Sequence, residues 1–247
     1  MPTKWNEPPE PTPSWLDESV EVTRANDAPK LPVVEFGPRC VEALLALGCS
    51  LEQACSVAGN TFNEAAFGRS YRGWNLGGWK ITKSFADAYK LKHGKPAPWW
   101  RAVGNKSSGD RPWCYYRAFD GLEHFFREWL LLFVPKPGTV GSKHRYKRSG
   151  ELFWSGGDWF PALIQGGYKG EVTKANPAGS IAEHRLLQRS ALVRWAQARL
   201  GVVADGAWGP RSSAACSAFQ VAHALPATGT LDEPTARALL AVPALAA

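Results

Sequence analysis

Residues 64–81 read Glu64-Ala-Ala-Phe-Gly-Arg-Ser-Tyr-Arg-Gly-Trp-Asn-Leu-Gly-Gly-Trp-Lys-Ile81, a carboxylate followed by a loop rich in glycine and tryptophan. A helix is predicted over 51–66, because Ser50 and Gln53 have the spacing of a capping box. Glu64 therefore lies where a helix ends and an aromatic loop begins. A carboxylic acid held among apolar rings can stay protonated and donate to a glycosidic oxygen. A lone glutamate at a helix end is also a common solvated surface residue.

The surrounding sequence predicts a fold that is mostly helical. Apolar residues at i, i+3 and i+4 spacing predict helices over 41–47, 122–133 and 159–165. Residues 71–115 lack this periodicity, so we expect loops with a short hairpin or two. The proline-rich stretch 1–38 predicts an extended arm. The expected fold class is α+β, mostly α, with a small β-lobe.

Charge and apolar content limit the kinds of partner and location that the sequence allows. The 247 residues carry a formal charge of +7, which suits a polyanionic partner and equally suits an ordinary soluble protein. The longest apolar run, 129–134, is too short to span a bilayer. The first residues contain no apolar segment typical of a secretory signal, so we expect synthesis in a cytoplasm. Residues 136–148 hold five Lys or Arg and no acid, and predict a basic loop.

The common signatures of metal and nucleophile chemistry are missing. The five histidines show no paired-ligand spacing, and the sequence contains no G-x-S-x-G motif or phosphate-binding loop. No metal and no cofactor are therefore expected. The five cysteines form no C-x-x-C pair and predict reduced, mostly buried thiols.

Residues 186–247 predict a separate unit of three helices, at 190–200, 211–223 and from Asp232 to Leu240. The informative motifs are Asp205-Gly206-x-Trp208-Gly209-Pro210-x-Ser212, Ala218-Phe219-Gln220 and Leu225-Pro-Ala-Thr-Gly-x-Leu-Asp-x-x-Thr235. In order and spacing this pattern resembles the bacterial peptidoglycan-binding domain of the three-helix type, over nearly all of 189–241. The resemblance implies binding to murein glycan or stem peptide.

The implied wall-anchor residues are Asp205, Gly206, Trp208, Phe219 and Gln220. Trp208 stands where smaller apolar residues or Phe are usual in that domain. Its ring is either a platform for a sugar or peptide, or part of the core.

The string from Glu64 to Ile81 is similar to that of the bacterial glucosaminidase family, which includes flagellar peptidoglycan hydrolases and autolysin glucosaminidases. Two later segments, 116–123 and 162–168, extend the resemblance to about residues 40–187. It implies a lysozyme-like fold with Glu64 as the general acid. The substrate-binding residues that it implies are Trp74, Asn75, Gly77, Trp79, Lys80 and Tyr168. Phe119 in place of Tyr, and Trp79 in place of an aliphatic residue, depart from the family pattern.

A second catalytic carboxylate is harder to assign from sequence. Asp110 is the candidate by its position in a loop, and a turn Asp paired with Arg111 explains the same residue equally well. Asp120 is expected to cap the helix that follows it. Asp87 and Glu123 are weaker candidates for the second role.

Together these expectations describe a murein hydrolase with an arm at 1–38, a catalytic domain at 39–185 and a wall-binding domain at 186–247. The expected activity is that of an endo-β-N-acetylglucosaminidase in a phage endolysin. The alternatives are a muramidase or lytic transglycosylase, a secretion-system effector, and a non-catalytic wall-binding protein. The expected partner is peptidoglycan, reached after membrane breach or delivery. Nucleic acid binding and stable membrane insertion are not expected, and the chain is expected to be a monomer.

Overall fold

The computed structural model describes residues 12–23, 27, 30–69, 71–103, 113–168 and 170–243. Helices dominate these residues, and the sheet seen among them has two strands. The elements in chain order are η2 (Glu18–Val20), α1 (Val33–Ala46), α2 (Leu51–Glu64), η3 (Ala66–Gly68), α3 (Lys83–His93), β1 (Trp99–Val103), β2 (Trp113–Arg117), α4 (Leu122–Phe133), α5 (Lys147–Trp154), α6 (Phe160–Gln165), α7 (Gly170–Ala175), α8 (Ala178–Arg199), α9 (Pro210–Ala222) and α10 (Glu233–Ala241). The expected class, α+β and mostly α, is confirmed.

The chain divides into two compact units. The first combines residues up to Lys30 with Arg69–Phe125, and the second combines Leu31–Gly68 with the chain from Phe126 onward. The first unit holds the hairpin and α3. The second holds most of the helices.

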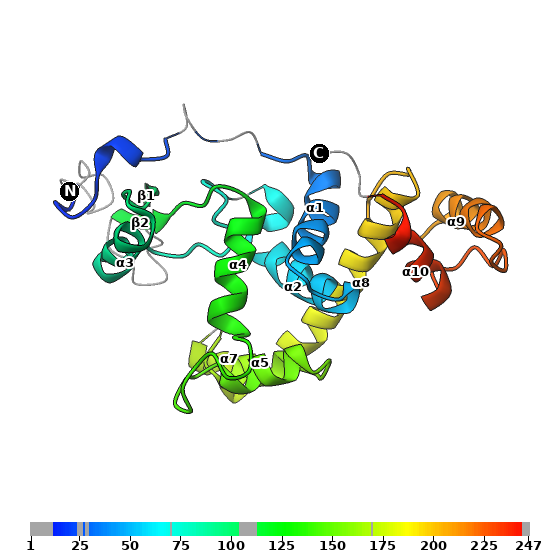
Figure 1. Cartoon of the computed structure of the whole chain (residues 1–247). Helices are drawn as coiled ribbons and strands as arrows, with labels where there is room; N and C mark the ends of the chain where they lie inside the picture. Colours follow the sequence, from blue (N-terminus) through cyan, green and yellow to red (C-terminus); the bar gives the residue numbers. More distant parts are fainter. Residues whose placement is uncertain are drawn as a thin grey trace, which may run out of the picture. The chain divides into compact units, whose positions relative to one another are not determined.

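In the second unit, α1, α2 and α8 pack against one another, as the two blue and cyan helices and the long yellow helix of Figure 1 show. Their contact faces bury large apolar side chains, including Phe36, Leu44, Phe62 and Trp195. The predicted helix at 41–47 begins earlier, at Val33, and contains Pro38. Burial of Phe36 on this helix outweighs the breaking tendency of proline, so the expected extended arm ends before residue 33.

Helix α8 is a continuous element of 22 residues. It crosses the predicted domain limit at 185/186, and the helix predicted at 190–200 therefore begins at Ala178. At the end of α8, Arg199 forms a bidentate ion pair with Glu42 of α1, with nitrogen to oxygen distances of 2.8 and 2.9 Å. The guanidinium also donates to the carbonyl of Val242, just beyond α10. One side chain thus joins α1, α8 and the end of α10.

In the first unit, β1 and β2 pair antiparallel, with Trp99 opposite Arg117. Single bridges extend the hairpin at both edges, through Glu21 beside Trp99 and Lys80 beside Tyr116. The side chain of Trp99 is fully buried in a core with Leu16, Ile81 and Tyr89. The hairpin expected within 71–115 is therefore confirmed.

The expectation of loops alone around this hairpin was wrong, because α3 occupies Lys83–His93. Thr82 caps it by accepting from the backbone N–H of Phe85, and Gly94 ends it with φ +68°. Only a narrow apolar face, including Ala86 and Tyr89, is buried, and the remaining positions are largely charged or polar. So narrow a stripe gives a weak periodic signal.

Two further findings concern cysteines and membranes. All five cysteines are free and buried, as expected, and burial raises the pKa of Cys49 to about 11. In the part of the chain that the structure describes, no helix is both long and apolar enough to cross a bilayer.

Candidate functional site

The second unit brings Glu64 and Tyr168 together from positions 104 residues apart. Glu64 is the last residue of α2 and is exposed, and Tyr168 follows α6. The Tyr168 hydroxyl donates to Glu64 Oε1 at 3.5 Å. Asn60, one helical turn before Glu64, donates its amide N–H to the same hydroxyl at 2.7 Å. A carboxylate, a phenol and an amide therefore form one polar cluster.

The direction of these hydrogen bonds follows from the chemistry of the groups. The Asn60 amide occupies an acceptor position on the hydroxyl, so the Tyr168 proton is free to point at the carboxylate. Burial raises the pKa of Tyr168, and the negative charge of Glu64 raises it further. The phenol therefore stays protonated across the neutral range and acts as a donor. Phe133 packs edge-on against its ring, with centroids 5.0 Å apart, and fixes its orientation.

Sequence reasoning predicted Glu64 and Tyr168 through the family resemblance but missed Asn60. The available signal was spacing, since Ser56, Asn60 and Glu64 lie at i, i+4 and i+8 on α2 and share one face. The expected burial of Glu64 among aromatic rings is not seen in its own unit, where the residue is exposed.

The other predicted substrate-binding residues, Trp74 to Lys80, belong to the first unit. Asn75 is buried and uses both amide N–H groups on backbone carbonyls, those of Trp79 and Arg117, at 2.9 Å each. Its Oδ1 accepts the backbone N–H of Trp79. Asn75 therefore closes the loop against β2 and leaves no amide N–H for a ligand.

The same loop explains Gly77 and positions two tryptophans. A side chain at Gly77 would place Cβ 2.7 Å from the indole nitrogen of Trp79, so any larger residue there would displace that ring. Trp74 has φ +53°, a conformation that a bulky residue rarely adopts, and its ring stacks on Tyr71. Lys80 is exposed and pairs by its backbone with Tyr116. Trp74, Trp79 and Lys80 thus remain candidates for substrate contacts, while Asn75 and Gly77 shape the loop.

The predicted second carboxylate, Asp110, lies outside the described residues. Of its rivals, Asp87 is exposed and paired with Lys83 at 2.6 Å on α3. Asp120, two residues before α4, lies 3.1 Å from Nδ1 of His124 in the first turn of that helix. Both contacts are local and suit structural roles.

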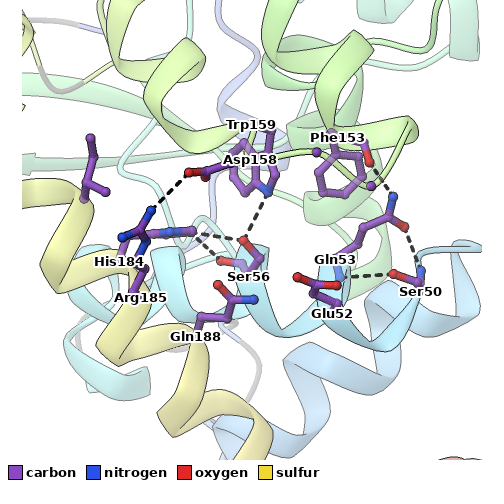
Figure 2. Close-up of a pocket in the computed structure, with 13 residues that line it drawn as sticks. Ser50, Glu52, Gln53, Ser56, Phe153, Asp158, Trp159, His184, Arg185 and Gln188 are labelled. Atoms are coloured by element: carbon purple, nitrogen blue, oxygen red, sulfur yellow. Dashed lines mark hydrogen bonds and ion pairs between the residues drawn. The ribbon is translucent and has the colours of Figure 1, made fainter. Parts of the chain in front are cut away.

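A polar pocket of about 220 Å³ lies between α2, α8 and the α5–α6 connection, as Figure 2 shows. At its floor, the Ser56 hydroxyl lies 3.2 Å from Nε2 of His184 and accepts the indole N–H of Trp159 at 3.1 Å. The His184 ring stacks on Phe160 with centroids 3.7 Å apart. These buried groups use their polar atoms on one another, which is the arrangement of a network that holds α2 to α8.

Of the predicted wall-anchor residues, Asp205, Gly206 and Trp208 lie on the loop before α9, and Phe219 and Gln220 lie within α9. Two buried glutamines, Gln197 and Gln220, hold the loops on either side of α9. Gln220 donates to Thr228 Oγ1, Thr230 O and Thr235 Oγ1, and accepts the N–H of Gly229. Gln197, which sequence reasoning missed, donates to Asp205 Oδ1, Ala207 O and Ser212 Oγ, and accepts the N–H of Gly206. Every contact of one glutamine has its equivalent 23 residues away on the other. This part of the chain therefore contains an internal repeat, in which each copy consists of the end of one helix, the loop that follows and the start of the next helix.

Within this repeat, the predicted anchor residues have identifiable structural tasks. Hydrogen bonds from the N–H of Ala207, and then from Gln197, hold the pKa of Asp205 below its usual value. Gly206 has φ +84°, which favours glycine. Trp208 is half-buried and donates its indole N–H to Gly229 O at 3.1 Å, linking the two loops. Phe219 is half-buried and stacks on His223.

Replacing Gln220 with Ala should lower the free energy of unfolding by about 1–3 kcal/mol, because buried donors and acceptors lose their partners. Urea unfolding followed by tryptophan fluorescence measures this change. Gln165→Ala, on the exposed side of α6, is the matched control and should leave the midpoint unchanged. Equal midpoints for the two variants would contradict the structural role of Gln220.

No protein-family model, curated protein or solved structure matches this chain. In the described ranges, no three or more His, Cys, Asp or Glu side chains gather in a group that could hold a metal ion. The case for a function therefore depends on the geometry above and on the sequence motifs.

Proposed function

We propose that this chain is a peptidoglycan hydrolase that cleaves β-1,4 glycosidic bonds of the murein glycan, in the manner of an endo-β-N-acetylglucosaminidase. The observation that carries the proposal is the cluster of Glu64, Tyr168 and Asn60 at the end of α2. A solvent-accessible carboxyl group can contact a bound glycoside and, when protonated, donate its proton, and the fixed phenol then donates to the carboxylate that is left. The lysozyme-like fold and a role in phage-mediated host lysis are parts of the same proposal.

In the proposed reaction, Glu64 donates its proton to the glycosidic oxygen and is left as a carboxylate. The Tyr168 hydroxyl then donates a hydrogen bond to Oε1, stabilising that negative charge. Water, or the acetamido group of the substrate, completes the displacement at the sugar carbon.

The helical repeat at the end of the chain supplies the second part of the proposal, a wall anchor. Its two loops carry the motifs that resemble a peptidoglycan-binding domain, and the buried glutamines fix their shape. Attachment to the wall would raise the concentration of glycan around the catalytic cluster.

Tyr168→Phe should lower the rate of murein solubilisation about 10- to 100-fold, the value of a lost hydrogen bond to a charged group. Binding to sacculi should be unchanged, because the ring and its packing on Phe133 are retained. Turbidity loss of purified sacculi measures the rate, and co-sedimentation at 4 °C measures binding. Tyr115→Phe, a half-buried tyrosine on β2, is the matched control. A Tyr168→Phe rate equal to that of the unchanged protein would remove Tyr168 from the proposal.

The experiment that tests the function is digestion of purified sacculi, with mass spectrometry of the soluble products after borohydride reduction. Reduced N-acetylglucosamine ends are expected. Reduced or anhydro N-acetylmuramic acid ends would identify a muramidase or a lytic transglycosylase instead. Peptides freed from intact glycan would show that the protein is not a glycosidase. Binding to sacculi without release of soluble products would identify a non-catalytic wall-binding protein.

A further inference from the structure

Two consecutive leucines lie exposed near the end of α4. Leu131 is 54% exposed and Leu132 is 40% exposed. Six other large apolar side chains are exposed in the described part of the chain, and each lies singly in the sequence. Single exposed apolar residues are ordinary, whereas these two neighbours form a small apolar patch on the helix surface.

Beside this pair, the structure forms an apolar cavity of about 320 Å³. Leu131 lines it together with Leu47, Leu130, Val134 and Trp154. Through Leu131, the leucine pair therefore borders a recess that can accept further apolar groups.

The rim of this cavity is positively charged. Its charged lining residues are Arg127 and Lys136, and no carboxylate lines it. The Lys136 ammonium lies 5.0 Å from the centre of the Trp154 ring. Lys143, seven residues further along the chain, is also exposed. Glu151, the next acid along the chain, is paired with Lys147 and Arg148.

We propose that this leucine and lysine surface, formed by Leu131, Leu132, Arg127 and Lys136 around the cavity, binds the interface of a bilayer that contains anionic phospholipid. The leucines enter the boundary between headgroups and acyl chains, and the cations contact the lipid phosphates. A soluble polyanion would use the cations and leave the leucines in water, so the combination favours a lipid surface. The attachment is peripheral, and it does not depend on hydrolysis of murein.

Flotation of the full chain with vesicles tests this inference, using phosphatidylcholine alone and phosphatidylcholine with phosphatidylglycerol. The protein should float with the anionic vesicles. Leu131→Glu with Leu132→Glu should weaken that binding at least about tenfold, through loss of apolar burial. Lys136→Glu should weaken it about fivefold or more, since one cation near an anionic surface is lost and an anion is added.

The matched control is Leu186→Glu with Val221→Glu, which adds the same charge at two exposed apolar positions on α8 and α9. This control should still float, and all variants should show the urea midpoint of the unchanged chain. Failure to float with anionic vesicles would overturn the inference. So would equal loss in the control, which would assign the effect to net charge, or undiminished flotation of the leucine variant. No murein is present in this assay, so its outcome is separate from that of the sacculus digestion.

Discussion

Glu64→Gln should abolish murein solubilisation, with a rate about 10²–10⁴-fold below that of the unchanged chain, the usual contribution of a general acid. Glutamine keeps the size of the side chain and can still accept the Tyr168 hydrogen bond through its carbonyl oxygen. It cannot donate a proton to a leaving oxygen. Because Glu64 is exposed at a helix end, the substitution should leave the free energy of unfolding nearly unchanged.

The discriminating measurement pairs activity with binding. Co-sedimentation of Glu64→Gln with sacculi should equal that of the unchanged protein, since the proposed anchor is a separate structure. Glu52→Gln, an exposed glutamate in the first turn of the same helix, is the matched control and should keep full activity. If Glu64→Gln still solubilised murein, Glu64 would not be the general acid. If Glu52→Gln lost activity as well, the cause would be a general effect of substitution on α2.

The helices that sequence predicted well are those with strong local signals. The predicted limits of α4 coincide with the observed ones, because its apolar residues recur at helical spacing and proline follows its end. Helix α10 begins after Asp232, which accepts the N–H of Thr235 as an N-cap does. Helices α1 and α8 were predicted too short, since the residues that extend them gain their stability from packing on α2.

In the candidate site, too, the sequence indicates individual residues but does not indicate the contacts that form only on folding. Sequence motifs led to Glu64 and Tyr168 separately, but the hydrogen bond between them depends on folding across 104 positions. Asn60 and Gln197 lie outside the sequence motifs that carry the family resemblances. Asn60 is visible only as a polar residue one turn before Glu64, and Gln197 only as the equivalent of Gln220 in a 23-residue repeat. The signal for both residues is therefore a pattern of fixed spacing in the sequence.

Glu42→Ala should lower the free energy of unfolding by about 3–5 kcal/mol, the cost of leaving a buried charge without its partner. The side chain of Arg199 is only 5% exposed, and both carboxylate oxygens of Glu42 accept from it. The indole N–H of Trp195 also donates to Glu42, at 2.8 Å. Removing one carboxylate therefore deprives the guanidinium of its anionic partner and the indole of its acceptor at the junction of α1 and α8.

A double-mutant cycle separates the interaction energy of Glu42 with Arg199 from the loss of side-chain packing. Arg199→Leu alone leaves Glu42 without its cationic partner, whereas Glu42→Ala with Arg199→Leu removes both charges. The double variant should be more stable than the sum of the single effects predicts, by about 1–3 kcal/mol, because neither charge then remains buried alone. Glu35→Ala, an exposed glutamate on the same helix, is the control and should change the urea midpoint little. Additive single effects would show that the pair contributes no coupling, and the link between α1 and α8 would then depend on apolar packing alone.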